Sequence, residues 1–370
     1  MCGITGTYNF INPSLIKKML SEIHHRGPDD TGFCIVDNVM LGIKRLSILD
    51  IEMGSQPMFS SDKSKVLVFN GEIFNFIELK EELIKKGVKF HTKNSDTEVI
   101  LKLYEFYGIK FLEKLNGMFA IALYDNKKKK LFLARDRVGI KNVFYSNINN
   151  FFIFGSEIKA ILKSNLVKKK PNLKAIFNFF SYKNVPSPET AFENIHQVMP
   201  GEIIQVDNNG IKKSRFWDLK IKKNQVFSEG ELENKILTTL DKSVKMQLRS
   251  DVEVGFFLSG GLDSSAITYL SSLHTKKKLK TFTLVYEDSY KQKMQDRIFA
   301  KKMSQLVGSD HFEFFIDEKK VFENLDNALK SFDQPFGGVI SMYYLAEEIS
   351  KHVKVALSGD GADELFGSYL

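Results

Sequence analysis

Residues 252–265 read VEVGFFLSGGLDSS, and this stretch decides the fold of the second half of the chain. Residues 252–258 are largely apolar, which predicts a buried strand, and the spacing over 262–273 predicts a helix directly after it. A helix is expected over 232–248, and residues 281–286 predict a second strand. This alternation is typical of βαβ units in a parallel sheet.

The loop from Ser259 to Ser265 joins that strand to that helix. Such a loop aims several backbone N–H groups and a helix N-terminus at one point, which favours the binding of an anion. It is not a Walker loop, because the Gly-Lys-Ser/Thr ending is missing, so simple γ-phosphoryl transfer is the weaker interpretation. A Ser/Gly turn that binds nothing is the structural alternative.

The first half reads as short strands separated by turns, with few helices. Alternation over 3–10 predicts an opening strand, and the apolar runs 66–69 and 119–124 predict buried ones. Asp125 and Asn126 form a turn into 131–134, which predicts a hairpin with its tip in water.

The sequence predicts two helices in this half. One is expected from about Asn75 to a stop at Gly87, and the other from a capping box, Ser95 with Glu98, to Gly108. Near residue 230, after a polar stretch, the pattern changes from short strands and turns to alternating helices and strands. We therefore expect two domains, 1–210 and 211–370, in agreement with the usual size of a domain core.

The composition is that of a folded globular protein, since 43% of the 370 residues are hydrophobic and 26% are charged. No apolar run reaches the roughly 18 residues that span a bilayer, and the N-terminus lacks the pattern of a signal peptide. Only Cys2 and Cys34 are present, which fits a reducing compartment and predicts a cytoplasmic protein without membrane contact. The net charge of +8 comes from scattered lysines, so no nucleic-acid partner is expected.

Cys2 becomes the first residue once Met1 is removed, which places a thiol and a free α-amine on one residue. That amine has a reference pKa of roughly 7.7 to 8.0, so near neutrality it can accept the thiol proton. A small buried hydrophobe is the alternative for a cysteine that stands alone.

Cys2 does not stand alone, because six separated motifs occur in order. They are Cys2-Gly3-Ile4, Arg26-Gly27-Pro28-Asp29, Arg45 to Asp50, Asn70 to Asn75, Ser95 to Glu98 and Gly117 to Ala120. Together they resemble the class II glutamine amidotransferases, the N-terminal-nucleophile glutaminases. The resemblance implies an α+β first domain built as an αββα sandwich.

The resemblance also implies roles for single residues. Cys2 would attack the amide of glutamine, and the side chain of Asn70 and the N–H of Gly71 would form the oxyanion hole. Arg45 would bind the substrate carboxylate and Asp96 its ammonium. The remaining residues of the implied glutamine pocket are Leu46, Ser47 and Glu72.

Structural alternatives exist for several of these residues. Asp96 could be only a helix-start residue, and Asn70-Gly71 could be a plain hairpin turn. The segment Arg26 to Asp29 could simply shape the pocket. His24 and His25 are expected to be structural.

The loop of the second half resembles the PP-loop of ATP pyrophosphatases, which implies a doubly wound α/β domain. Its implied contacts to ATP come from Leu258, Ser259, Gly260, Gly261, Asp263, Ser264, Ser265 and Leu284. Within this set, Asp263 would also help to place Mg²⁺, because carboxylates suit that hard ion.

Residues 355–357 predict a strand that leads into Ser358-Gly359-Asp360-Gly361-Ala362-Asp363-Glu364, which resembles the second signature of the asparagine synthetase family. Ser358 and Gly359 would contact the nucleotide, and Asp363 would bind Mg²⁺ or pyrophosphate. Asp360 is the expected catalytic acid, although many asparagine synthetases have Glu there. The acceptor therefore stays open between aspartate and another carboxylate.

The resemblance as a whole implies a glutamine-hydrolysing asparagine synthetase with the substrates glutamine, ATP and aspartate. The same machinery acting on a sugar acid is one alternative, and a regulatory or binding module without synthetic activity is another. A homodimer is compatible with the sequence. Proteins with both signatures usually continue well beyond the second, so we expect this chain to hydrolyse glutamine but to form amide poorly.

Overall fold

The computed structural model describes residues 1–221, 227–286, 291–316, 318–337 and 340–367. The chain divides into two compact units, of which the first comprises Met1–Ile221 together with Asp333–Gly337. This first unit extends past residue 210 because β12 (Gly210–Arg215) pairs with β11 (Glu202–Asp207) along its whole length. Each unit has its own sheets and its own hydrophobic core.

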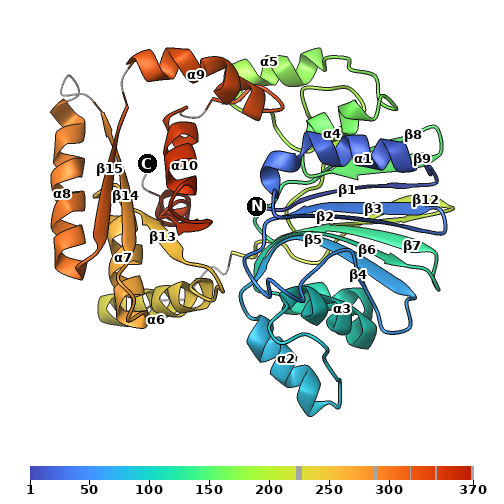
Figure 1. Ribbon diagram of the computed structural model, residues 1–370, viewed down its shortest axis with the longest axis horizontal. Helices are drawn as coiled ribbons and strands as arrows, with labels where there is room; N and C mark the ends of the chain where they lie inside the picture. Colours follow the sequence, from blue (N-terminus) through green and yellow to red (C-terminus); the bar gives the residue numbers. More distant parts are fainter. Residues whose placement is uncertain (222–226, 287–290, 317, 338–339, 368–370) are drawn as a thin grey trace. The chain divides into compact units, whose positions relative to one another are not determined.

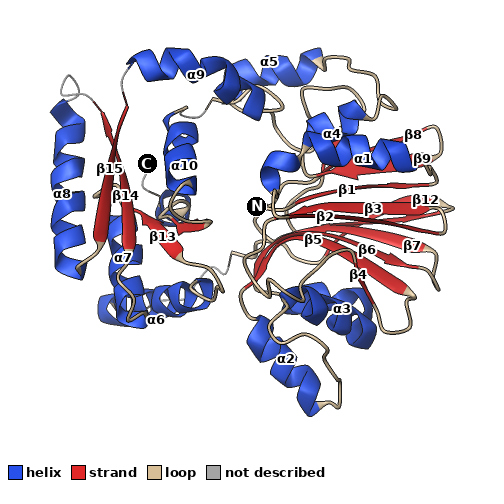
Figure 2. Cartoon of the chain, viewed as in Figure 1, coloured by secondary structure: helices blue, strands red, loops and turns tan. Residues whose placement is uncertain are grey.

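Two antiparallel sheets form the centre of the first unit (Figure 2). One has the order β10-β8-β9-β1-β3-β2, with β1 Gly3–Tyr8, β2 Asp30–Val36, β3 Val39–Arg45, β8 Phe144–Ile148, β9 Phe151–Gly155 and β10 His196–Gln197. The other has the order β12-β11-β7-β6-β5-β4, with β4 Met58–Phe59, β5 Lys65–Ile73, β6 Gly117–Asp125 and β7 Lys130–Arg135.

Helices cover both outer faces of this pair of sheets (Figure 1). The first sheet carries α1 (Pro13–Glu22) and α4 (Ile158–Lys163), and the second carries α2 (Phe76–Lys85) and α3 (Asp96–Tyr107). A further helix, α5, spans Leu173–Tyr182. The predicted αββα sandwich is thereby confirmed.

The strand β5 shows why residues 66–69 look apolar on both faces. Val66 and Val68 belong to the core cluster between the sheets, whereas Leu67 and Phe69 belong to the cluster under α2 and α3. Alternate side chains of a strand point to opposite faces, so a strand covered on both sides must be apolar throughout. The prediction of buried strands at 66–69 and 119–124 is confirmed.

Both predicted helices of the first half are present, but the predicted capping box at Ser95 is wrong. The Ser95 side chain makes no capping hydrogen bond. The carboxylate of Glu98 is buried and accepts hydrogen bonds from the backbone of His91 and from the backbone and hydroxyl of Thr92. Three donors in the preceding loop therefore compete successfully with the single N–H that a capping box offers.

The second unit is built on a parallel sheet of order β15-β14-β13-β16. Its strands are β13 Val254–Phe257, β14 Lys280–Tyr286, β15 Asp310–Ile316 and β16 Val355–Leu357. Its helices are α6 Glu229–Gln247, α7 Leu262–His274, α8 Lys291–Val307, α9 Glu318–Ser331, α10 Ser341–Ser350 and α11 Ala362–Phe366.

Helices cover both faces of this sheet, with α10 on one side and α8 on the other (Figure 1). On the α10 side, Leu345 and Ile349 pack with Phe282 of β14 in one core cluster. The predicted doubly wound α/β domain is confirmed. None of the helices in the described part of the chain is long and apolar enough to cross a membrane.

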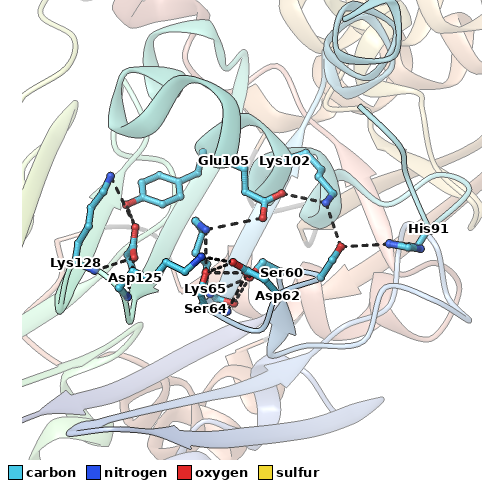
Figure 3. Close-up of polar contacts among 12 residues, drawn as sticks. Ser60, Asp62, Ser64, Lys65, His91, Lys102, Glu105, Asp125 and Lys128 are labelled. Carbon is cyan, nitrogen blue, oxygen red and sulfur yellow. Dashed lines mark hydrogen bonds and ion pairs between the residues drawn. The ribbon is translucent and has the colours of Figure 1, made fainter. Parts of the chain in front are cut away.

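The predicted hairpin tip at residues 126–129 is held by Asp125, a residue that is 1% exposed. One carboxylate oxygen of Asp125 accepts hydrogen bonds from the backbone N–H groups of Lys127 and Lys128, both at 3.1 Å. The other oxygen accepts the hydroxyl of Tyr104 at 2.8 Å, which ties the hairpin to α3 (Figure 3). Nearby, the exposed Asp62 binds Ser60, Ser64 and Lys127 at the turn between β4 and β5.

We expect Asp125→Ala to lower the free energy of unfolding of the first unit by about 2 to 3 kcal/mol. The substitution leaves the Tyr104 hydroxyl and two turn amides without their acceptor, and an unsatisfied buried group costs about 1 to 3 kcal/mol. Urea unfolding of the variant and the parent chain measures the change. Asp62→Ala is the comparison variant with a smaller expected effect, because the Asp62 side chain is 44% exposed and water can replace its carboxylate.

Candidate active sites

Cys2 lies immediately before β1, and the pairing of β1 with β3 brings it beside the end of β3. Gly3 pairs with Lys44 in this register, so the chain leaving β3 passes the cysteine side chain. The backbone N–H of Leu46 donates to Cys2 Sγ at 3.3 Å, and the thiol lies 3.6 Å from the Leu46 carbonyl oxygen. Burial raises the pKa of the Cys2 thiol, whereas the contact with Leu46 lowers it.

Asp29 fixes the stretch that touches Cys2. Its side chain accepts the backbone N–H of Ser47 at 2.9 Å, and its own N–H donates to the carbonyl of Arg45 at 3.2 Å. The Arg26 to Asp29 segment therefore shapes this site, as one of the sequence alternatives proposed.

Asn70 and Gly71 lie inside β5, opposite Ala120 and Phe119, which excludes the hairpin-turn alternative for this pair. Asn70 is 1% exposed, and neither its side-chain nitrogen nor its oxygen has a hydrogen-bond partner within the described residues. An unsatisfied buried amide costs about 1 to 3 kcal/mol, so its presence marks a place where a ligand can supply the partner. A Cβ on Gly71 would lie 2.0 Å from the Met118 carbonyl oxygen, so this position requires glycine.

Two buried carboxylates, Asp96 and Glu72, lie close enough to influence each other, and Asp96 also lies close to Cys2. Asp96, the first residue of α3, accepts the N–H of Ile73 at 3.1 Å, and burial raises its pKa to about 6. Burial, with the neighbouring Asp96 charge, raises the pKa of Glu72 to about 8. Two acids whose ionisation is disfavoured in this way favour a positively charged ligand.

Arg45 is held in place by backbone carbonyls. Its guanidinium donates to the carbonyls of Leu49, Asp50 and Ile51 at 3.0, 2.8 and 3.2 Å. Among the described residues no carboxylate forms an ion pair with it. A planar fork of donors that lacks an acid partner suits a ligand carboxylate.

Sequence reasoning missed Lys141, which lies in the same buried region. Its ammonium is 2.9 Å from the Met1 sulfur, and burial lowers its pKa to about 8. The Asp136 carboxylate accepts a hydrogen bond from the Lys141 backbone N–H at 2.9 Å. A lysine in a loop carries no motif, so only the fold brings it to the N-terminus.

The second site lies at the carboxyl end of the parallel sheet. The strand β13 lies between β14 and β16, so the strand order reverses there, which is the usual position of a ligand crevice in doubly wound folds. A cavity of about 570 Å³ opens at this point. Ten of the predicted residues line it: Leu258, Ser259, Gly261, Asp263, Ser264, Leu284, Ser358, Gly359, Asp360 and Asp363.

Gly260 and Ser265 are not among the lining residues of this cavity. Gly260 has φ of +87°, and a Cβ there would lie 2.1 Å from the Asp296 carbonyl oxygen, so it shapes the loop. Ser265 belongs to the first turn of α7, where its N–H donates to the Gly261 carbonyl. Sequence reasoning missed Asp296 and Ser341, which line the cavity from α8 and α10.

The two loops of this site touch each other. Ser259 and Ser264 lie 3.0 Å apart at their hydroxyl oxygens, which closes the first loop on itself. A Cβ on Gly359 would lie 2.8 Å from Asp263 Cβ and 2.8 Å from the Ser264 nitrogen. The absence of a side chain at 359 therefore allows the second signature to meet the first.

Comparison with known proteins identifies the family of each half of the chain. Residues 1–217 match the glutamine amidotransferase domain family and residues 235–370 match the asparagine synthase family. Asparagine synthetase 1 of Bacillus subtilis, glutamine-hydrolysing, is 36% identical over the whole of this chain, which spans 59% of that protein. A putative glutamine-hydrolysing asparagine synthetase 2 of Methanocaldococcus jannaschii is also 36% identical, and the chain spans 76% of its length.

The chain belongs to the glutamine-hydrolysing asparagine synthetase family. Asparagine synthetase 3 of Bacillus subtilis, a further member, is 35% identical over the whole chain, which spans 63% of that relative. The family resemblance expected from the sequence motifs is confirmed. The roles assigned to single residues stay predictions.

Within the described residues, no group of three or more His, Cys, Asp or Glu side chains converges as a metal site. Asp263, Asp360, Asp363 and Glu364 nevertheless all line the one cavity. This oxygen-rich lining fits an ion that takes part of its coordination from phosphate oxygens, as Mg²⁺ usually does in nucleotide sites.

In this synthetase family member, we expect Gly359→Ala to weaken the binding of ATP about tenfold or more. The added methyl group presses on Asp263 and Ser264, and overpacking of this kind typically costs about 1 to 3 kcal/mol. Titration with a fluorescent ATP analogue measures the change. Gly230→Ala is the control, because a Cβ there meets nothing within 4 Å. An unchanged dissociation constant for Gly359→Ala would contradict the close contact between the loops.

Proposed function

We propose that this protein is a glutamine-hydrolysing asparagine synthetase, which converts ATP, aspartate and glutamine to AMP, pyrophosphate, asparagine and glutamate. The observation that carries the proposal is a half-buried cysteine at position 2 that lies close to Arg45 and Asp96, in a chain that also has a cavity at the carboxyl end of a parallel sheet. A regulatory module without synthetic activity needs neither feature. The family names of the relatives support aspartate over a sugar acid as the acceptor.

In the first reaction the Cys2 sulfur attacks the amide carbon of glutamine. The thiol proton passes to the α-amine that removal of Met1 exposes, and from there to the departing ammonia. Asn70 and the Gly71 N–H donate to the developing oxyanion. The C–N bond breaks to leave a thioester, which water hydrolyses to glutamate.

The same pocket orients the substrate. Arg45 binds the α-carboxylate of glutamine, and Asp96 with Glu72 binds the α-ammonium, while the backbone of Leu46 and Ser47 lines the remaining wall. The raised pKa values of Glu72 and Asp96 fit this role, because an incoming ammonium supplies the missing countercharge.

In the second reaction the acceptor carboxylate attacks the α-phosphorus of ATP and pyrophosphate leaves. Ammonia then attacks the activated carboxyl carbon and AMP leaves. The loop residues Ser259, Gly261 and Ser264 bind the phosphates, and Leu258 and Leu284 contact the nucleoside. Asp263 and Asp363 would hold Mg²⁺, which when bound neutralises phosphate charge. Asp360 would act beside the reacting carboxyl group.

A reduced thiol is required at Cys2, which supports the cytoplasm as the site of action. An acceptor screen tests the proposal. Pyrophosphate release is followed with ATP and glutamine in the presence of aspartate, glutamate or glucuronate. Release that depends on aspartate supports the synthetase, release with another acid supports the alternative acceptor, and no release with any acid contradicts synthetic activity in this chain.

We expect Cys2→Ala to abolish glutamine hydrolysis, because the substitution removes the sulfur that forms the thioester. Glutamate release measures the loss, and Cys34→Ala is the matched control that should retain activity. Intact-mass analysis should show that the active parent begins at Cys2. Hydrolysis at the parental rate by Cys2→Ala, or retention of Met1 on active protein, would show that the nucleophile is wrongly assigned.

We expect the KM for glutamine to fall at least about fivefold as pH rises from 6 to 8.5. Asp96 and Glu72 have pKa values of about 6 and about 8 in the free protein, so both ionise over this window and then attract the α-ammonium. Initial rates at several pH values measure the trend. Glu72→Gln should flatten the part above pH 7, whereas the exposed control Glu81→Gln should not, and a pH-independent parental KM would contradict the assignment.

A further inference from the structure

Arg26 connects the nucleophile to an ion-pair network whose other members, Glu157, Lys159 and Asp333, lie outside the six glutaminase motifs. Its Nε donates to the backbone carbonyl of Cys2 at 2.9 Å. Its terminal nitrogen Nη1 donates to Glu157 Oε1 at 2.8 Å, and both side chains are 12% exposed. The guanidinium therefore joins the main chain of the nucleophile to the partly buried carboxylate of Glu157.

Glu157 lies between β9 and α4, next to a second anchor of β1. The preceding residue, Ser156, exchanges hydrogen bonds with Ile4 through its hydroxyl and its backbone N–H, both at 2.9 Å. Glu157 Oε1 also forms a hydrogen bond with His25 Nε2 at 2.9 Å. Although burial alone would raise it, these hydrogen bonds hold the pKa of Glu157 at about 2, so its charge is present at neutral pH.

The network continues to Asp333, which follows α9 in the sequence but belongs to the first compact unit. Lys159 Nζ lies 3.3 Å from Glu157 Oε2 and 3.4 Å from Asp333 Oδ1. The other oxygen of Asp333 accepts the N–H of Ile158 at 2.5 Å, at the start of α4. Asp333 is 11% exposed, so the charge is largely shielded from water.

Two neighbours of Asp333 help to seat this segment. The side-chain oxygen of Gln334 accepts the Ala191 N–H at 3.2 Å. A Cβ on Gly337 would lie 2.5 Å from the Lys183 carbonyl oxygen, so the backbone approaches closely there. Asp333 is thus placed by its own segment as well as by the ion pair.

We propose that Arg26, Glu157, Lys159 and Asp333 act as positioning residues for the first reaction, and that glutamine hydrolysis depends on Asp333. The inference rests on the proposed glutaminase function of Cys2. Removal of the Asp333 charge takes away one of the two carboxylates that share the Lys159 ammonium, which draws Glu157 towards Lys159 and away from Arg26 and releases the Cys2 carbonyl. A displacement of about 1 Å at a reacting atom can cost about 10²-fold in rate.

The effect should appear in kcat rather than in KM. Arg45, Asp96 and Glu72 bind glutamine without using this network, so substrate binding is preserved when the nucleophile shifts. Asp333→Asn is the informative substitution, because the amide oxygen can still accept the Ile158 N–H and the start of α4 is retained. Asp333→Glu restores the charge and should recover part of the rate.

The test uses the full chain with Asp333→Asn, Asp333→Glu and Glu157→Gln. The control is Asp326→Asn, the same chemical change at an exposed residue of α9. We expect kcat for glutamine hydrolysis to fall about tenfold or more in Asp333→Asn and Glu157→Gln, with KM within twofold of the parent. The variant that combines Asp333→Asn with Glu157→Gln should lose little more activity than either single variant, because both substitutions act through one network.

A second measurement is independent of glutaminase activity. The rate of Cys2 alkylation by iodoacetamide, followed by peptide mass spectrometry, should change at least about threefold in Asp333→Asn and not in Asp326→Asn. Parental kcat and parental alkylation in Asp333→Asn would overturn the inference, as would a rise in KM alone. If the parent chain fails to hydrolyse glutamine, the proposed function falls, and the alkylation rates still decide whether Asp333 positions Cys2.

Discussion

The pairing of β1 with its two neighbours is the constraint on which the first site depends. Gly3 lies opposite Lys44 of β3, and Thr5 lies opposite Gly155 of β9. One neighbour leads into Leu46, and the other leads into Glu157, so the two flanks of Cys2 are fixed by strand register. A slip of one residue would turn the alternate side chains of β1 to the wrong faces and separate both contacts.

Three carboxylates of low exposure, those of Glu157, Glu72 and Asp96, lie near the start of β1. Their neighbours give them two different roles. Glu157 Oε1 accepts hydrogen bonds from Arg26 and His25, and the pKa of Glu157 is lowered, which suits a structural anchor. Glu72 and Asp96 have raised pKa values, which suits a pocket that awaits a cation. The difference comes from the neighbouring donors, because burial acts to raise the pKa of all three carboxylates, whereas Glu157 also has Arg26 and His25 as hydrogen-bond partners.

The second unit uses backbone geometry where the first uses side-chain charge. Parallel pairing of β13 with β16 brings the carboxyl ends of both strands to the same edge, and the loops after them meet where Gly359 has no side chain. The resulting cavity gathers N–H groups, hydroxyls and carboxylates within one space, as phosphate binding requires. Neither loop could form this lining alone.

The sequence by itself determined both fold classes, both signatures and the family, because strand and helix periodicities and loop motifs depend on neighbours within a few residues. It misassigned Glu98, whose carboxylate is taken by the loop at 91–92 rather than by Ser95. Only the tertiary structure placed Lys141 beside the N-terminus and Asp333 beside Lys159. Such contacts join residues far apart in the chain, so they arise from strand pairing and burial and leave no local pattern to read.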